Sequence, residues 1–159
     1  MPEATKKPKV IRTPAHHAAA AVHAPKERKA HGKYVEAVGR RKTAVARVRI
    51  LEGNGKVTVN GKDAKQYFPL ARLVADAIAP LTGLKIAGEW DVIVHVSGGG
   101  IHAQAGAVRL GVARALVKKN AEWKKLLRVS GFMTRDSRMV ERKKYGLKKA
   151  RRSPQWAKR

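Results

Sequence analysis

Hydrophobic and polar residues alternate in three short stretches of the first half of the chain. Residues 34–38, 43–51 and 56–60 each place apolar side chains at every second position, a period typical of half-buried strands. The Glu-Gly-Asn-Gly sequence at residues 52–55 separates the last two stretches, and Asn-Gly provides the positive φ that a tight turn requires. The pattern therefore predicts three short antiparallel strands, of which the second and third form a hairpin.

Helical periodicity begins after these strands. Residues 63–68 predict a single helical turn, and residues 70–81 predict a helix that Pro80 and Gly83 bring to an end. Residues 90–96 are the most strand-like run of the chain, because valine alternates there with other residues.

Three consecutive glycines, Gly98, Gly99 and Gly100, separate this strand from a long helix. Apolar residues recur at helical spacing over residues 101–120, and residues 121–129 predict a second, shorter helix.

The long predicted helix contains two glycines, which are unfavourable in a helix interior. Gly106 and Gly111 each cost about 1 kcal/mol relative to alanine. We therefore expect a neighbouring strand or an RNA backbone to lie very close to the helix at these positions.

The charge of the chain narrows the class of its partner. Its 159 residues include 36 Lys and Arg and 11 Asp and Glu, which give a formal net charge of +25. Such a charge destabilises an isolated compact protein and attracts phosphate strongly. Basic residues occur in every segment rather than on one amphipathic helix, so nucleic acid is favoured over an anionic membrane or an acidic substrate.

The absence of cysteine and of long apolar runs excludes other classes of protein. Without cysteine, disulfides, thiolate chemistry and cysteine-ligated zinc are excluded. No apolar run approaches the roughly 20 residues that span a bilayer, and no signal-peptide core follows the N-terminus. We therefore expect an intracellular, unsecreted protein with no membrane partner.

The composition divides the chain into three parts. Residues 1–33 are rich in Pro, Lys, Ala and His and predict a disordered basic arm; a metal site in its histidines is disfavoured, because no carboxylate or cysteine converges with them. Residues 34–130 hold the periodic elements and predict the folded domain. Residues 131–159 have too few apolar residues for a core and predict an extended tail that a polyanion orders. The basic residues of the tail are Arg135, Arg138, Arg142, Lys143, Lys144, Lys148, Lys149, Arg151, Arg152, Lys158 and Arg159.

The succession of strand, triple glycine and helix is typical of phosphate-binding loops. The backbone N–H groups of such a loop are unobstructed and lie at the positive end of a helix dipole. A nucleotide-hydrolysing or phosphoryl-transferring enzyme is disfavoured, because the Lys-Ser/Thr pair of a P-loop is missing and no acidic pair stands nearby for magnesium. A site for nucleic-acid phosphate and a plain tight turn both stay open as interpretations.

A basic cluster lies near the first predicted strands. Arg40, Arg41 and Lys42 are consecutive, and Arg47 and Arg49 project to one face of the following strand. No serine–histidine–acid or paired-carboxylate arrangement accompanies the cluster. We therefore expect RNA binding here, with no catalytic residue, no metal or other cofactor and no small-molecule substrate.

Four motifs follow one another along the chain: YVEAVGRRKTAVARV at residues 34–48, VNGK at 59–62, GGGIHAQAGAVRLGVARAL at 98–116 and GFMTRDSRMVERKKYGLKKARRSPQWAKR at 131–159. In this combination the chain resembles the bacterial form of the family of the ninth protein of the small ribosomal subunit. The resemblance covers residues 34–159 and leaves the arm outside.

The resemblance implies a two-layer α/β (α+β) fold, with a mixed four-stranded sheet backed by helices, bound to 16S rRNA in the head of the small subunit beside neighbouring head proteins. It also implies that the tail passes through rRNA to the peptidyl site, where Lys158 and Arg159 contact tRNA, in a protein that is cytoplasmic and ribosome-bound. The residues expected to bind rRNA are Arg40, Arg41, Lys42, Arg47, Arg49, Gly98, Gly99, Gly100, Gln104, Arg109, Arg135, Arg138, Arg142, Lys143, Lys144, Lys148, Lys149, Arg151 and Arg152.

The chain departs from the family pattern at two positions. Ala103 stands where a glycine is usual, which tests how close the backbone must come to RNA. Leu110 stands where a histidine is common, so a polar contact made there by other members is missing.

Two other classes of protein share some of these features. A nonspecific DNA-compacting protein shares the charge and the tails, and a nucleotide-dependent enzyme would use the triple-glycine loop. We interpret the chain as a structural RNA-binding protein that catalyses nothing.

Overall fold

The computed structural model describes residues 34–157, and these contain five strands and four helices. The elements in chain order are β1 (Val35–Arg41), β2 (Ala44–Glu52), β3 (Val57–Val59), β4 (Lys62–Asp63), α1 (Ala64–Tyr67), α2 (Ala71–Gly83), β5 (Trp90–Ser97), α3 (Ile101–Lys119) and α4 (Trp123–Val129). Every element predicted from the sequence is present, and the ends differ by at most three residues.

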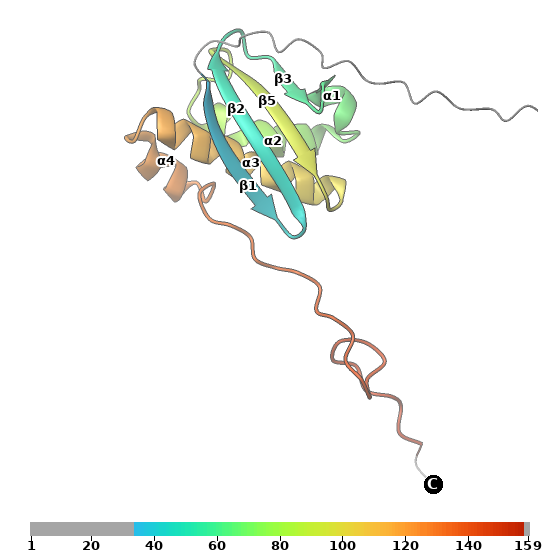
Figure 1. Cartoon of the computed structure of the whole chain (residues 1–159). Helices are drawn as coiled ribbons and strands as arrows, with labels where there is room; N and C mark the ends of the chain where they lie inside the picture. The colour runs from blue at the N-terminus through green and yellow to red at the C-terminus, as the bar shows by residue number, and fades with distance from the viewer. Residues whose placement is uncertain (1–33, 158–159) are drawn as a thin grey trace, which may run out of the picture. The chain divides into compact units, whose positions relative to one another are not determined.

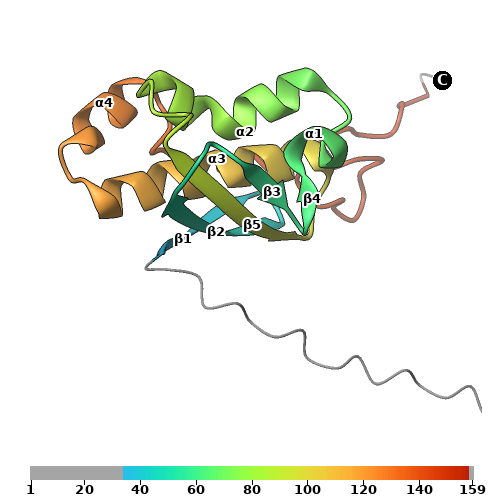
Figure 2. The same ribbon diagram turned by 90° about the horizontal axis from the view of Figure 1, so that it is seen from above.

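One mixed sheet contains all five strands, in the order β1-β2-β5-β3-β4; Figure 1 labels the first four, and Figure 2 also labels β4. The pairs β1–β2, β2–β5 and β3–β4 are antiparallel, whereas β3 runs parallel to β5. The predicted α+β fold with a mixed sheet and helices is confirmed. The sheet has one strand more than the four predicted, because the two-residue β4 extends its edge.

The predicted hairpin between β2 and β3 is wrong. These two strands are not neighbours, since β5 lies between them and pairs with both. The turn that connects them is present, with a φ of +81° at Gly55, but it is held by the start of β5. Asp91 Oδ1 accepts hydrogen bonds from the backbone N–H groups of Asn54 and Lys56 at 2.9 and 2.8 Å.

A tight hairpin joins β1 to β2. Arg41 pairs with Ala44, so the turn consists of Lys42 and Thr43. Lys42 has a φ of +50°, the left-handed conformation that the favoured two-residue turns require at their first position. The basic residues before the turn therefore belong to β1, where the sequence had suggested an interruption.

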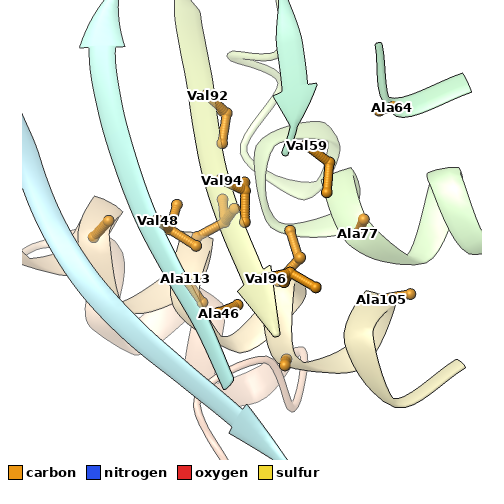
Figure 3. Packing of buried hydrophobic residues seen from close by; sticks show 14 of the residues in the cluster. Ala46, Val48, Val59, Ala64, Ala77, Val92, Val94, Val96, Ala105 and Ala113 are labelled. Atoms are coloured by element: carbon orange, nitrogen blue, oxygen red, sulfur yellow. The ribbon is translucent and has the colours of Figure 1, made fainter. Parts of the chain in front are cut away.

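The helices cover one face of the sheet (Figure 2). α3 packs against β1 and β2, and α2 packs against α3. Val48, Val92 and Val94 point into this core and are fully buried, as is Ala113 of α3 (Figure 3). Val108 of α3 is also fully buried. Burying a valine or leucine stabilises a fold by about 1.5–3 kcal/mol, so the alternation along the strands accounts for the layering.

α3 crosses β1 at very short range, as its two glycines had predicted. A Cβ atom on Gly39 of β1 would lie 1.9 Å from the carbonyl oxygen of Ala107. A Cβ atom on Gly111 would lie 2.5 Å from a methyl group of Val48. The neighbour that requires glycine here is thus a strand of the same domain.

The opposite face of the sheet has no helix on it among residues 34–157. Its outward side chains alternate with the core residues and include Val38, Arg40, Arg47 and His95, all of them exposed.

In the part of the chain that the structure describes, no helix has the length and apolar character needed to cross a membrane.

Candidate nucleic-acid interface

The β1–β2 turn and the end of β1 before it carry one exposed cation each. Arg40 and Lys42 are both exposed, and within residues 34–157 neither side chain has a hydrogen-bond or ion-pair partner. Each therefore presents a full positive charge to solvent, as a phosphate contact requires.

Two arginines on the outer sheet face share one carboxylate. Arg47 donates to Glu36 Oε1 from Nε at 3.1 Å and from Nη2 at 3.0 Å, and Arg49 donates from Nε to Glu36 Oε2 at 3.3 Å. The hydrogen bond from Arg47 is the main cause of a lowered Glu36 pKa. Arg49 also lies over the Tyr34 ring, 4.8 Å from its centroid. The guanidiniums are brought together as predicted, but Glu36 cancels one of their two charges.

Arg41 points away from this face and across α3. Its Nη1 donates to the carbonyl oxygen of His102 at 3.2 Å, and its Nη2 donates to Asp136 Oδ2 at 3.0 Å. The side chain passes over Gly106, where a Cβ atom would lie 2.4 Å from Arg41 Cδ. Gly106 thus makes room for an arginine, and the partly buried Arg41 is held against α3.

Asp136 binds two arginines at once. Besides Arg41, it accepts hydrogen bonds from the backbone N–H, Nε and Nη2 of Arg138, at 3.1, 3.0 and 3.1 Å. The side chain of Arg138 and then its backbone N–H hold the pKa of Asp136 well below its ordinary value; Arg41 adds to this lowering, and partial burial opposes it. Because the pKa is lowered, these contacts are fully present above the ordinary carboxyl range and weaken only as pH falls far below it.

Packing explains two of the three consecutive glycines. Gly98 and Gly99 have φ values of +71° and +63° and lie against the β1–β2 turn. A Cβ atom on Gly98 would lie 2.6 Å from the Thr43 carbonyl oxygen, and one on Gly99 would lie 3.0 Å from Ala44 Cβ. Gly100 is the N-cap of α3 and has no such neighbour among the described residues. The plain tight turn thus accounts for the first two glycines, and phosphate binding at this loop stays a prediction.

Gln104 belongs to a hydrogen-bond network inside the domain. Its Oε1 accepts from the Tyr67 hydroxyl at 2.9 Å, and its Nε2 donates to the Gly98 carbonyl oxygen at 3.1 Å. Next to it, Asn60 exchanges hydrogen bonds with the backbone of Val96, at 2.9 and 3.0 Å. No local pattern in the sequence indicates this network, because its members come from separate elements.

Arg109 lies half-buried on α3 and lines a small cleft with Arg40, Arg41 and Asp136. Leu110, at the position where the family often has histidine, also lines the cleft and is only 3% exposed. Ala103, the other departure, is 6% exposed and belongs to the core.

The basic tail follows α4 and forms no helix or strand between residue 130 and residue 157. It contains a closed loop at residues 141–152 (Figure 1). Glu141 pairs with Arg151, the backbone N–H of Lys148 donates to the Arg152 carbonyl oxygen at 2.7 Å, and Gly146 has a φ of +73°. The sequence had suggested an extended tail. In the structure the tail is not uniformly extended, because it contains this loop.

Most cations of the described tail are exposed. Arg138 and Arg151 pair with acidic residues of the tail itself. The exposed residues for which the described chain shows no acidic partner are Arg135, Arg142, Lys143, Lys144, Lys148, Lys149 and Arg152. The predicted tRNA-binding residues Lys158 and Arg159, like the arm at residues 1–33, lie outside the described residues.

Two aromatic side chains of the tail are almost fully exposed. Tyr145 is 97% exposed and Trp156 is 91% exposed. Side chains of this size are seldom left in water, and in a basic segment they are available to stack on unpaired bases. The predicted set of RNA-binding residues did not include them, although aromatic residues among basic ones are a visible sequence signal.

Within residues 34–157, no group of three or more His, Asp or Glu side chains is placed to hold a metal ion.

A family model described as ribosomal protein S9/S16 matches residues 39–159. The match covers well over half of the chain, from within β1 to the end of the tail.

Proposed function

Because the chain belongs to the ribosomal protein S9/S16 family, we propose that it binds 16S rRNA in the head of the small subunit and contacts peptidyl-site tRNA through its tail. Membership of the family makes it a structural, non-enzymatic protein of the small ribosomal subunit that serves translation. Its partners are rRNA and other ribosomal proteins.

The observation that carries this proposal is the tail, which lies within the family match and leaves seven described cations exposed without an acidic partner. A segment with so much unneutralised charge gains affinity from each phosphate that it contacts, by release of counterions. Arginine and lysine contacts of this kind position a protein on RNA through its backbone.

The contribution of each predicted rRNA-binding residue follows from its pairing. Arg40, in β1, and Lys42, in the β1–β2 turn, are exposed and have no side-chain partner among residues 34–157, so we assign them the direct phosphate contacts of the domain. Arg47 and Arg49 share Glu36, so together they offer one net charge. We place Gly98, Gly99, Gly100, Gln104 and Arg109 near the RNA along α3 and the loop before it, with a mainly structural role for Gly98, Gly99 and Gln104.

The two aromatic residues extend the proposed interface. Base stacking contributes about 1–3 kcal/mol per base and accepts any base. Tyr145 follows Arg142, Lys143 and Lys144 directly, so its ring would reach unpaired bases close to the phosphates that those cations bind.

The last two residues, Lys158 and Arg159, are assigned to peptidyl-site tRNA by the family resemblance. Recognition there should be of backbone and shape, because every tRNA must be accepted.

Replacing both residues tests this assignment. Small subunits that carry Lys158→Ala and Arg159→Ala should assemble normally and bind peptidyl-site tRNA roughly tenfold more weakly, because charge-assisted hydrogen bonds are lost. Filter binding of tRNA to purified subunits over a range of salt concentrations measures the loss. The matched control removes the same charge from α4, with Lys124→Ala and Lys125→Ala, both exposed in the domain.

Equal tRNA affinity of the tail variant and the unmodified subunit at every salt concentration would refute the tRNA assignment. A protein that left the ribosomal fraction on sedimentation and resisted RNase would instead be a DNA-compacting protein.

A further inference from the structure

The first residues of the tail are held against the folded domain before the tail becomes solvent-exposed. Phe132 and Met133 are half-buried and pack against the core. Asp136 then forms an ion pair with Arg41, at the end of β1. Within residues 34–157, Asp136 is the last residue that hydrogen-bonds to any of the elements from β1 to α4.

Arg41 is placed for this contact by the domain. The side chain is only 28% exposed, lies over Gly106 and uses its two Nη atoms for two different acceptors, the His102 carbonyl and Asp136. Its Nε is buried and has no hydrogen-bond partner in the described chain. A lysine has a single nitrogen at its tip and lacks this planar fork, so it cannot reproduce the arrangement.

Asp136 is also protected from solvent. Its side chain is 19% exposed, and Arg138 holds both carboxylate oxygens from the other side. A phosphate that bound Arg41 would first have to displace this carboxylate, which is already bound by two guanidiniums.

We propose that Asp136 is a positioning residue, which fixes the point where the tail leaves the domain, and that Arg41 serves this ion pair rather than binding RNA. The advantage of the Asp136–Arg41 ion pair rests on the proposed function, since a tail that binds RNA benefits from a defined starting point. Fixing that point in the free protein lowers the ordering entropy lost on binding.

A distance measurement in the free, full-length protein tests the positioning directly. The chain has no cysteine, so Lys125→Cys on α4 and Met139→Cys in the tail, both exposed, accept one spin label each. Pulsed electron resonance should give a narrow distance distribution, and Asp136→Ala should broaden it. Glu141→Ala is the matched control, because it also removes one tail carboxylate and one ion pair but none to the domain. An unchanged distribution in Asp136→Ala would overturn the inference.

Arg41→Lys should broaden the same distribution with the domain still folded, as checked by circular dichroism. If that variant fails to fold, the Asp136→Ala measurement tests the inference by itself. This variant should fold, since Asp136 lies outside every helix and strand of the described chain.

The affinity of variants for 16S rRNA distinguishes a positioning role of Asp136 and Arg41 from a direct contact between Arg41 and RNA. Asp136→Ala removes a negative charge, so simple electrostatics predicts tighter binding, whereas loss of positioning predicts binding weaker by a factor of roughly three to ten. Arg41→Ala should weaken binding by the same factor, and the double variant should be no worse than either single one. The slope of log affinity against log salt should stay unchanged in Arg41→Ala and decrease by about one in Arg142→Ala.

Tighter binding by Asp136→Ala would show that the charge of Asp136 matters and its position does not. A slope reduced by about one in Arg41→Ala would show that Arg41 binds phosphate. Either result would overturn the inference. If the spin-label result is as expected but even Arg142→Ala leaves rRNA binding unchanged, the RNA-binding role of the tail fails while the positioning stands.

Discussion

Single basic residues of this protein differ in how much charge they offer to a ligand. Arg40 and Lys42 have no side-chain partner in the described part of the chain, whereas their neighbour Arg41 is bound to a carboxylate 95 residues away in the sequence. The sequence predicted all three as one cluster, because nothing local distinguishes them. Gly106 leaves the space that Arg41 occupies in this ion pair, but the contact between the two residues is visible only in the fold.

Gly39 offers a test of packing at the scale of one residue. Gly39→Ala would place a methyl group 1.9 Å from the Ala107 carbonyl oxygen, so β1 and α3 must separate. We expect a loss of roughly 1–3 kcal/mol in the free energy of unfolding, measured by urea denaturation of the full chain. Gly88→Ala is the control, because no atom lies within 4 Å of the added group and the change should stay within about 0.5 kcal/mol. Equal stabilities of the two variants would contradict the close crossing.

At the scale of elements, local sequence patterns predicted the helices and most of the strands correctly, but they predicted the wrong neighbour for β2. Alternation and helical periodicity located every helix and every strand except the two-residue β4, since these patterns depend on which side chains are buried and both residues of β4 are exposed. The Asn-Gly turn at residues 54–55 was also present, yet the hairpin inferred from it was wrong. A turn signal describes four residues, whereas the neighbour of β2 was decided by β5, which pairs with β2 over eight residue pairs.

The triple glycine at residues 98–100 is a second case in which a local pattern does not show which distant residues pack against it. A strand, glycines and a helix are compatible with a phosphate loop, and the sequence left this reading open beside a plain turn. The structure supplies a steric reason for Gly98 and Gly99, which lie against Thr43 and Ala44. These neighbours belong to a different hairpin, so the sequence could not reveal them.

Asp91 is expected to hold the β2–β3 connection in place. Asp91→Ala removes the acceptor of the hydrogen bonds from Asn54 and Lys56. We expect a loss of about 1–3 kcal/mol in the free energy of unfolding, again by urea denaturation. Asp91→Asn keeps an acceptor oxygen and should lose less. If the asparagine variant were as unstable as the alanine variant, the role of these hydrogen bonds would be refuted.

For the whole molecule, the formal net charge of +25 determines the electrostatic behaviour more than any individual ion pair does. This net charge already subtracts every carboxylate, so the ion pairs of Glu36, Glu52, Asp136 and Glu141 do not reduce it further. This property could be predicted from the sequence alone, because a sum of charges does not depend on the fold.

Salt should therefore act in opposite directions on stability and on binding. Raising KCl from about 0.05 to about 0.5 M screens repulsion between exposed cations, so the melting temperature of the free protein should rise. The affinity for 16S rRNA should fall steeply over the same range. Calorimetry and filter binding measure the two effects, and a melting temperature that fell with added salt would show that self-repulsion does not limit stability.

The place of β5 between β2 and β3 sets an order of events while the chain is being made. A nascent β3 that has left the exit tunnel has only the two-residue β4 to pair with, since its other partner begins at Trp90. The β1–β2 hairpin likewise waits for α3, which supplies its buried partners. The domain thus closes only after Lys119 has been added, and Asp136 then meets an Arg41 that is already in position.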